Sequence, residues 1–123
     1  MHYLIDVIVP LPIDTLFTYK VNKIEYDFLK NGYRVIVPFG KSKLLTAIVV
    51  NKHNILPEFY DAKHIEFIID EEPIINNFQI KFFYWMSNYY MCPIGQVIKV
   101  SIPSLLLLKS ESEIVLYDEL KED

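Results

Sequence analysis

The chain has 123 residues, 52% of them hydrophobic, which predicts a single domain with a well-filled core and excludes an intrinsically disordered protein. Its one cysteine, Cys92, excludes a disulfide framework and a cysteine-based zinc site, so a reducing compartment is expected. The net charge of −4 is uneven, because residues 110–123 hold six carboxylates and one lysine and leave the other 109 residues at +1, a balance that excludes a broad basic face for nucleic acid.

The first residues predict two strands joined by a proline-containing turn. Residues 3–9 and 16–21 show the period-two pattern of half-buried strands, and in the second of these Phe17 and Tyr19 share one face. Asp6 lies within the first apolar run and no cationic segment precedes it, a pattern typical of neither a signal peptide nor a membrane span. The cytoplasm is therefore the expected location.

A hairpin is predicted in the middle of the chain. Residues 22–31 have helix-like spacing but little length, and we expect a loop or a single helical turn there. Gly32 to Lys41 is a short apolar strand closed by a Pro-Phe-Gly-Lys turn, and a further strand at 44–50 follows at once. The turn would expose backbone, an aromatic ring and a cation, a combination that suits phosphate or a nucleotide.

The segments after the hairpin alternate between loop and strand. Residues 51–62 are polar and contain a proline, which predicts a loop. Residues 63–69 predict a fifth strand that ends in a turn at 70–73. We interpret the acidic side chains of that turn as a solvated cap: Asp70, Glu71 and Glu72.

The period changes to that of a helix from Asn76 to Tyr90, with Asn76 or Asn77 as N-cap and Pro93 beyond the end. Its aromatic residues are interpreted as filling the open side of a small sheet rather than binding a cofactor: Phe78, Phe82, Phe83, Tyr84, Trp85, Tyr89 and Tyr90. Residues 95–102 predict a second short helix or turn. The expected fold is mainly β (α+β), a small OB-like β-barrel or curled sheet of about five strands closed by the aromatic-rich C-terminal helix.

Domain boundaries follow from composition. The domain is expected to span residues 1–108, with the leucines at 105–108 at its edge. Residues 109–123 are expected to form an acidic linker towards a following domain absent from this chain, and residues 114–117 suit a strand of that domain.

No catalytic or metal-binding constellation is recognised. The three histidines fall in separate predicted elements without a carboxylate at ligand spacing. Gly40-Lys41-Ser42 lacks the leading glycine and the following helix of an ATP-binding loop.

With catalysis and metal binding set aside, binding of single-stranded nucleic acid is the function that remains. Such strands are held by aromatic stacking worth roughly 1–3 kcal/mol per base and by cations that contact the backbone. The candidate residues are Phe17, Phe39, Gly40, Arg34, Lys41 and Lys63. Core packing is the alternative role for Phe17 and Phe39.

Several short motifs follow one another along nearly the whole chain. They are Val9-Pro-Leu-Pro12, Phe17-Thr-Tyr19, Gly32-x-Arg-Val-x-Val-Pro-Phe-Gly-Lys41, Ala47-Ile-Val-Val50, Lys63 before an apolar run, Asp70-x-x-Pro73, Trp85-Met-Ser-Asn-Tyr-Tyr90, Pro93-Ile-Gly95 and Ile102-Pro103. In this order and spacing, residues 4–108 resemble the amino-terminal domain of the primosomal protein N-prime family, the PriA replication-restart helicases.

The resemblance implies a DNA-binding module that recognises the 3′ end of the nascent leading strand at stalled replication forks. Phe17 would contact the terminal base or sugar, Gly40 would let the backbone come close, and Lys63 would place a cation beside the terminal nucleotide. The fourth pocket position is Thr18, where the best-known members have an aspartate that accepts a hydrogen bond from the 3′ hydroxyl. A threonine hydroxyl accepts too, but it is neutral and shorter.

The resemblance also implies that this segment is non-catalytic and needs no cofactor, whereas the full-length parent would be an ATP-dependent 3′-to-5′ DNA helicase with ATP, magnesium and zinc bound in other domains. Expected partners are DNA with a free 3′ end at branched forks, the other helicase domains, and single-strand-binding and primosome proteins, at the nucleoid and without a membrane.

Two other classes of function stay open. One is a protein-interaction module of a larger replication or repair assembly without direct DNA contact, which an exposed Trp85 and Tyr89 would favour. The other is a small enzyme, which would require a cleft that gathers Asp70, Glu71 and a histidine.

Overall fold

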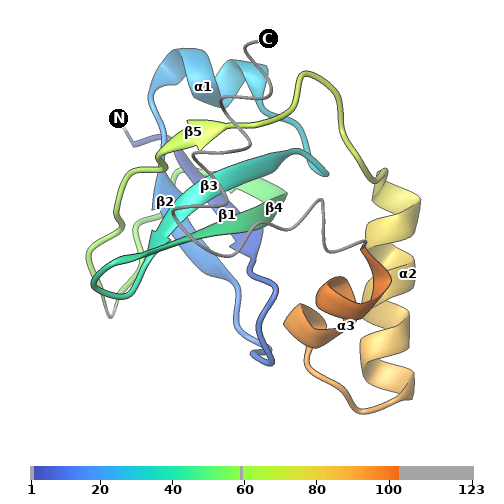
Figure 1. Ribbon diagram of the computed structural model, residues 1–123. Helices are drawn as coiled ribbons and strands as arrows, with labels where there is room; N and C mark the ends of the chain where they lie inside the picture. The colour runs from blue at the N-terminus through green and yellow to red at the C-terminus, as the bar shows by residue number, and fades with distance from the viewer. Residues whose placement is uncertain (1, 59, 103–123) are drawn as a thin grey trace, which may run out of the picture.

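Five antiparallel strands form one sheet in the order β2-β1-β4-β3-β5 in the computed structural model, which describes residues 2–58 and 60–102 (Figure 1). The strands are β1 (Leu4–Ile8), β2 (Phe17–Lys20), β3 (Arg34–Phe39), β4 (Lys43–His53) and β5 (Phe67–Ile68). The helices are α1 (Lys23–Phe28), α2 (Asn77–Tyr89) and α3 (Ile94–Ser101). The expected linker at 109–123, the domain boundary at 108 and the pieces at 105–108 and 114–117 lie outside the described residues.

The sheet is curled and open. Among the described residues, one isolated parallel bridge, between Lys20 and His64, connects edge strand β2 with the segment that leads into β5. Its hydrogen bonds run from Lys20 N to Lys63 O at 2.7 Å and from Ile65 N to Lys20 O at 3.1 Å. The prediction of a mainly β domain with a curled sheet of five strands is confirmed, and the sheet does not close into a barrel.

Two strand boundaries differ from the prediction, each because of a distant partner. β4 continues to His53, three residues into the expected loop, since residues 51–53 pair with residues 4–6 of β1. The strand expected at 63–69 is reduced to Phe67–Ile68. Residues 63–66 do not pair with a single neighbouring strand. Residues 63–65 hydrogen-bond to β2, whereas Glu66 N donates to Ile36 O of β3 at 2.8 Å.

Helices α1 and α2 both begin with a capping box. Asn22 Oδ1 accepts from Glu25 N at 2.7 Å and Glu25 Oε1 accepts from Asn22 N at 2.8 Å. The same reciprocal pair forms between Asn76 and Gln79 at the start of α2. These local signals satisfy backbone donors that a helix leaves unpaired, which is why the aromatic helix was predictable. α1, expected as a loop or a single turn, is a six-residue helix.

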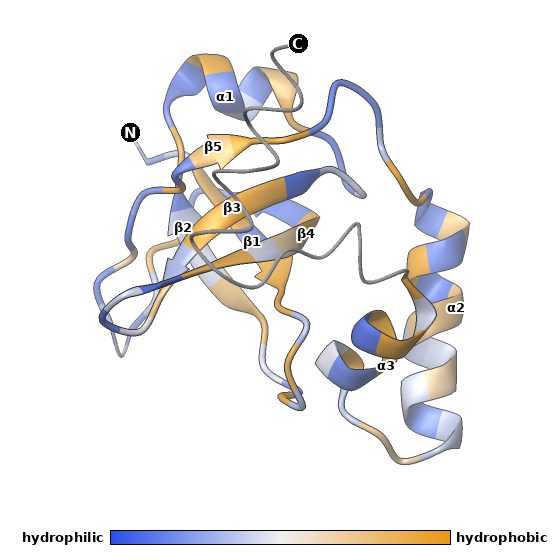
Figure 2. Cartoon of the chain, in the orientation of Figure 1, coloured by the Kyte–Doolittle hydropathy of each residue, from blue (hydrophilic) through white to orange (hydrophobic). Residues whose placement is uncertain are grey.

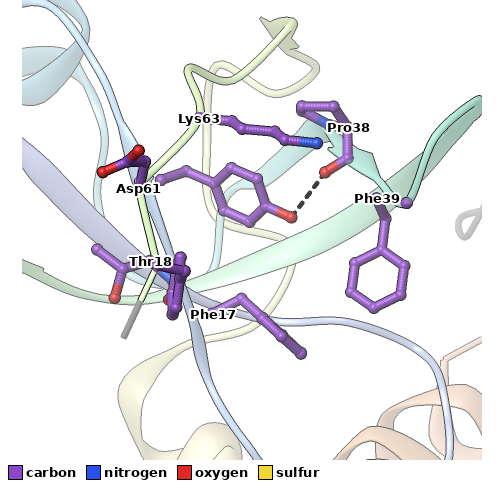
Figure 3. Close-up of a pocket in the computed structure, with 9 residues that line it drawn as sticks. Phe17, Thr18, Pro38, Phe39, Asp61 and Lys63 are labelled. Carbon is purple, nitrogen blue, oxygen red and sulfur yellow. Dashed lines mark hydrogen bonds between the residues drawn. The ribbon is translucent and has the colours of Figure 1, made fainter. Parts of the chain in front are cut away.

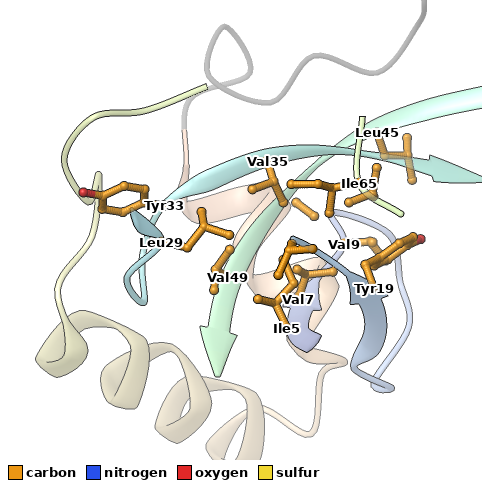
Figure 4. Close-up of a cluster of buried hydrophobic side chains, with 13 residues drawn as sticks. Ile5, Val7, Val9, Tyr19, Leu29, Tyr33, Val35, Leu45, Val49 and Ile65 are labelled. Carbon is orange, nitrogen blue, oxygen red and sulfur yellow. The ribbon is translucent and has the colours of Figure 1, made fainter. Parts of the chain in front are cut away.

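Alternation along the strands separates two layers of core. One layer lies inside the curl, where cross-strand neighbours Val35 and Ala47, Val37 and Leu45 meet (Figure 4). The other lies on the outer face, where Ile8 and Ile48 pack against α2 and α3. Figure 2 shows hydrophobic residues concentrated along the strands. The C-terminal helices therefore cover the outside of the sheet.

Most aromatic residues of α2 do not cover the sheet, so the prediction that they fill its open side is wrong for that set. Phe83 and Tyr84 pack beside the outer-face core, whereas the exposed residues are Phe78, Phe82, Trp85, Tyr89 and Tyr90. α3 supplies much of the apolar cover instead, through Ile94, Val97 and Ile98. Trp85 stacks between Phe82 and Tyr89, with ring centroids 5.8 Å and 5.0 Å away at 20° and 21°.

A buried ion pair joins the start of β3 to the turn that follows β5. Arg34 Nη2 donates to Asp70 Oδ1 at 2.7 Å, Arg34 Nε to Asp70 Oδ2 at 3.0 Å, and the side chains are 7% and 10% exposed. Asp70 Oδ2 also accepts from Arg34 N at 2.9 Å. The interpretation of Asp70 as part of a solvated cap is thus wrong, because its partner is 36 positions away; Glu71 and Glu72 are exposed as expected.

Replacing Asp70 by alanine removes the carboxylate from a buried guanidinium, and breaking such a pair costs about 3–5 kcal/mol. We expect Asp70→Ala to lower the free energy of unfolding by about that amount in a denaturant titration. Glu72→Ala, an exposed carboxylate in the same turn, is the control and should change it by less than about 0.5 kcal/mol. Equal stability of the two variants would contradict a structural role for the pair.

Candidate functional site

A cavity of about 240 Å³ opens where three segments of the chain meet (Figure 3). Its walls come from the start of β2, from the end of β3 with its turn, and from the connection between β4 and β5. The lining residues are Phe17, Thr18, Tyr19, Pro38, Phe39, Gly40, Tyr60, Asp61 and Lys63. Aromatic rings dominate this lining, and one lysine and one aspartate supply its formal charges.

Hydrogen bonds from β2 hold the other two walls in place. Tyr19 OH donates to Pro38 O at 2.8 Å, which ties β2 to the end of β3. Thr18 N donates to Tyr60 OH at 2.8 Å, and Lys20 N donates to Lys63 O at 2.7 Å. The loop of residues 60–63 is thus fixed at both ends, so the cavity is pre-formed.

The Tyr19 phenol stays protonated far into the alkaline range. Burial raises its pKa to about 12, and the nearby Tyr60 phenol adds to the increase. The hydroxyl is therefore a hydrogen-bond donor to Pro38 O at every physiological pH.

Phe17 and Phe39 serve both the core and the cavity. Their rings meet edge to face, with centroids 5.2 Å apart and an angle of 88°. Both side chains are half-buried and pack against the inner core while they also line the cavity. The core-packing role left open for them from the sequence is therefore observed, and both rings also remain accessible from the cavity.

Gly40 lies in the three-residue turn between β3 and β4 with a positive φ of +73°. A Cβ built there would meet no atom of the described structure within 4 Å. At Gly95 the situation is reversed, since a Cβ would lie 2.0 Å from Leu11 O. The chain itself thus leaves open the space beside Gly40, and a ligand could approach its backbone.

The structure brings together five of the seven site residues named from the sequence, namely Phe17, Thr18, Phe39, Gly40 and Lys63. Lys41 is exposed in the turn but does not line the cavity. Arg34 lies at the other end of β3, buried against Asp70, and does not reach the site. In Figure 3 the side chain of Lys63 extends towards Pro38.

Sequence reasoning missed four lining residues. Tyr19 shares a strand face with Phe17, so the period-two pattern could have placed it at the same site. Pro38 directly precedes Phe39, which was already a candidate. Tyr60 and Asp61 belong to a segment predicted as loop, where no local pattern marks a site. Tyr60 reaches the cavity through a contact 42 positions away, and only the fold reveals such a contact.

The described residues contain neither a candidate metal-binding cluster nor a helix suited to cross a membrane. Within 2–58 and 60–102, no group of three or more histidine, cysteine, aspartate or glutamate side chains is arranged to hold a metal ion. Likewise, none of the helices described has the length and apolar character needed to cross a membrane.

Comparison with known proteins gives consistent matches. A family model described as 3′DNA-binding domain (3′BD) matches residues 6–103. The chain is similar to the replication restart protein PriA of Buchnera aphidicola subsp. Acyrthosiphon pisum (strain APS), with 30% identity over 105 residues, 84% of this chain and 14% of that protein. It is 26% identical over 104 residues to the protein of the same name from Treponema pallidum (strain Nichols), covering 81% and 16%. The chain therefore spans 14–16% of the length of these relatives.

The raised pKa of Tyr19 predicts a loss of stability in alkali. Below pH 10 both folded and unfolded chains keep this proton, and the stabilisation is complete; it is lost as the pH rises through about 12, because the unfolded chain releases the proton first. We expect Tyr19→Phe to lower the free energy of unfolding by about 0.5–1.5 kcal/mol at neutral pH. Its stability should also fall less steeply than that of the unmodified chain between pH 10 and 12. Stability is measured by denaturant titration at each pH. If the free energies of unfolding of the two chains fall in parallel between pH 10 and 12, Tyr19 does not have the raised pKa.

Proposed function

The chain belongs to the 3′ DNA-binding domain family of the replication restart protein PriA, and we propose on this premise that it recognises the 3′ end of the nascent leading strand at stalled replication forks. The resemblance seen in its ordered motifs is thereby confirmed. The observation that carries the proposal is the cavity, in which aromatic rings, an open glycine backbone and one lysine converge from three segments.

Four of the lining residues and one neighbouring lysine contact the DNA in this proposal. Phe17 and Phe39 contact the terminal base or sugar, since aromatic faces bind bases with little regard to sequence. Gly40 admits the DNA close to the backbone, and Lys63 neutralises the phosphate beside the terminal nucleotide. The exposed Lys41 contacts the preceding phosphate from the turn. Arg34 takes no part, because its guanidinium is paired with Asp70.

A cavity of about 240 Å³ suits one strand end better than a length of duplex. This accounts for a DNA-binding domain without a basic face, since end recognition needs few phosphate contacts. Affinity of the isolated domain is then modest and is raised by linkage to other DNA-binding domains.

We propose that the domain is non-catalytic and needs no cofactor. ATP, magnesium and zinc would be bound in other domains of a parent helicase, which acts at the nucleoid with single-strand-binding and primosome proteins.

Fluorescence anisotropy with two labelled single strands, one ending in a 3′ hydroxyl and one in a 3′ phosphate, tests end recognition. We expect tighter binding of the free hydroxyl. Lys63→Ala should weaken it about tenfold or more, because a hydrogen bond to a charged group is worth about 1.5–3 kcal/mol. Gly40→Ala should weaken it as well, since the new Cβ occupies the open space beside the turn.

The matched control is Lys23→Ala, an exposed lysine on α1 that does not line the cavity. It removes the same charge and should leave binding within about twofold of the unmodified chain. Circular dichroism must show that all variants are folded. Folded Gly40 and Lys63 variants that bind as well as the control would rule out the cavity as the DNA site.

A second candidate function is a protein-interaction module, favoured by the exposed stack of Phe82, Trp85 and Tyr89 on α2. Trp85 is 54% exposed and is the chain's one tryptophan, so its fluorescence reports on α2 alone. Because the described lining of the cavity includes no residue of α2, DNA with a 3′ end should leave this emission unchanged, and Trp85→Ala should bind DNA normally. Quenching by DNA would instead place DNA on α2, and absence of any DNA binding would favour the protein-interaction role.

A further inference from the structure

The hydroxyl of Thr18 is already used inside the protein. Thr18 Oγ1 lies 2.7 Å from Asp6 Oδ1, and because a carboxylate only accepts, the threonine proton points to it. The same Asp6 oxygen lies 2.8 Å from His53 Nε2. His53 Nδ1 accepts from Ile55 N at 3.0 Å, so Nε2 carries the ring proton and donates to Asp6. Thr18 is thus one of two donors to a single carboxylate oxygen.

The sheet register also turns the Thr18 side chain away from the aromatic lining. Thr18 is the direct cross-strand partner of Asp6, and its neighbours Phe17 and Tyr19 pair with Val7 and Ile5. Since side chains alternate along a strand, Thr18 projects to the face opposite to that of Phe17 and Tyr19. Its hydroxyl is therefore poorly placed to be the main partner of a ligand bound against those rings.

Asp61 offers a carboxylate at the same cavity. It is exposed, lines the cavity, and within the described residues has neither a hydrogen bond nor an ion pair through its side chain. Hydrogen bonds to β2 fix the position of the residues on both sides of Asp61: Tyr60 OH accepts from Thr18 N, and Lys63 O accepts from Lys20 N. Ala62 is only 6% exposed, so the chain turns Ala62 inwards and leaves Asp61 exposed at the rim of the cavity.

We propose that Asp61 is the specificity-determining residue for a free 3′ hydroxyl, an inference that rests on the function proposed above. Its carboxylate accepts the hydrogen bond that the terminal hydroxyl donates. Its negative charge also repels a 3′ phosphate, while Lys63 pairs with the phosphate on the other side of the terminal nucleotide. The unpaired state of Asp61 supports this role, because a carboxylate that only accepts is matched to a hydroxyl donor.

The test compares three labelled strands that differ only at the 3′ terminus, which carries a hydroxyl, a hydrogen or a phosphate. With the full 123-residue chain we expect the hydroxyl end to bind about tenfold or more better than the other two. Asp61→Ala should reduce both preferences to about twofold or less. Asp61→Asn keeps an acceptor without the charge, so it should keep part of the preference over the hydrogen end but bind the phosphate end nearly as well as the hydroxyl end.

One control and one competing variant make the result specific. The control, Glu58→Ala, removes an exposed carboxylate from the same loop outside the lining and should leave both preferences unchanged. The competing variant is Thr18→Val, since Thr18 also lines the cavity, and it keeps both preferences if Asp61 carries the selectivity. Full preference in Asp61→Ala, or its loss in Thr18→Val alone, would overturn the role of Asp61 and leave end recognition standing. Absence of any preference in the unmodified chain would overturn the proposed function itself.

Discussion

The short segment from Tyr60 to Glu66 holds the curled sheet together, because its backbone hydrogen-bonds to edge strand β2 and also to β3 near the opposite edge. Lys63 and Ile65 hydrogen-bond to Lys20 of β2, and Glu66 N then donates to Ile36 O of β3. Edge strands expose unpaired backbone groups that favour such pairing. The crossing curls the sheet around its inner core and brings the loop between β4 and β5 against Phe17 and Gly40. Fold and cavity therefore arise from the same few hydrogen bonds.

The two cations Arg34 and Lys63 differ in burial, and this difference separates a structural charge from one that is free to bind a ligand. Arg34 is buried on the outer face of β3, where a charge must be paired, and the Asp70 carboxylate accepts hydrogen bonds from both the side chain and the backbone of Arg34. Lys63 is exposed, its side chain lines the cavity, and only its backbone carbonyl is engaged with β2. A nearly neutral domain can thus bind an anionic partner locally, because few of its charges need to be free.

The aromatic residues divide in a similar way between packing and exposure. Phe17 and Phe39 contact the inner core with one side and the cavity with the other. On α2 the residues facing the sheet are covered, whereas Trp85 and its stacked neighbours lie on the far face. Amino-acid composition does not distinguish a buried ring from an exposed one. Their position on a strand or helix decides which become core and which remain available to a partner.

Local patterns in the sequence predict the first strands, the β3–β4 hairpin with Gly40 in its turn, and the capped helix from Asn76. These features depend on residues a few positions apart, so period and capping are enough to predict them. The burial of Asp70 with Arg34 and the place of Asp61 at the cavity come from the folded arrangement of the strands. Those contacts join residues tens of positions apart, and no local pattern encodes which distant groups a curled sheet brings together.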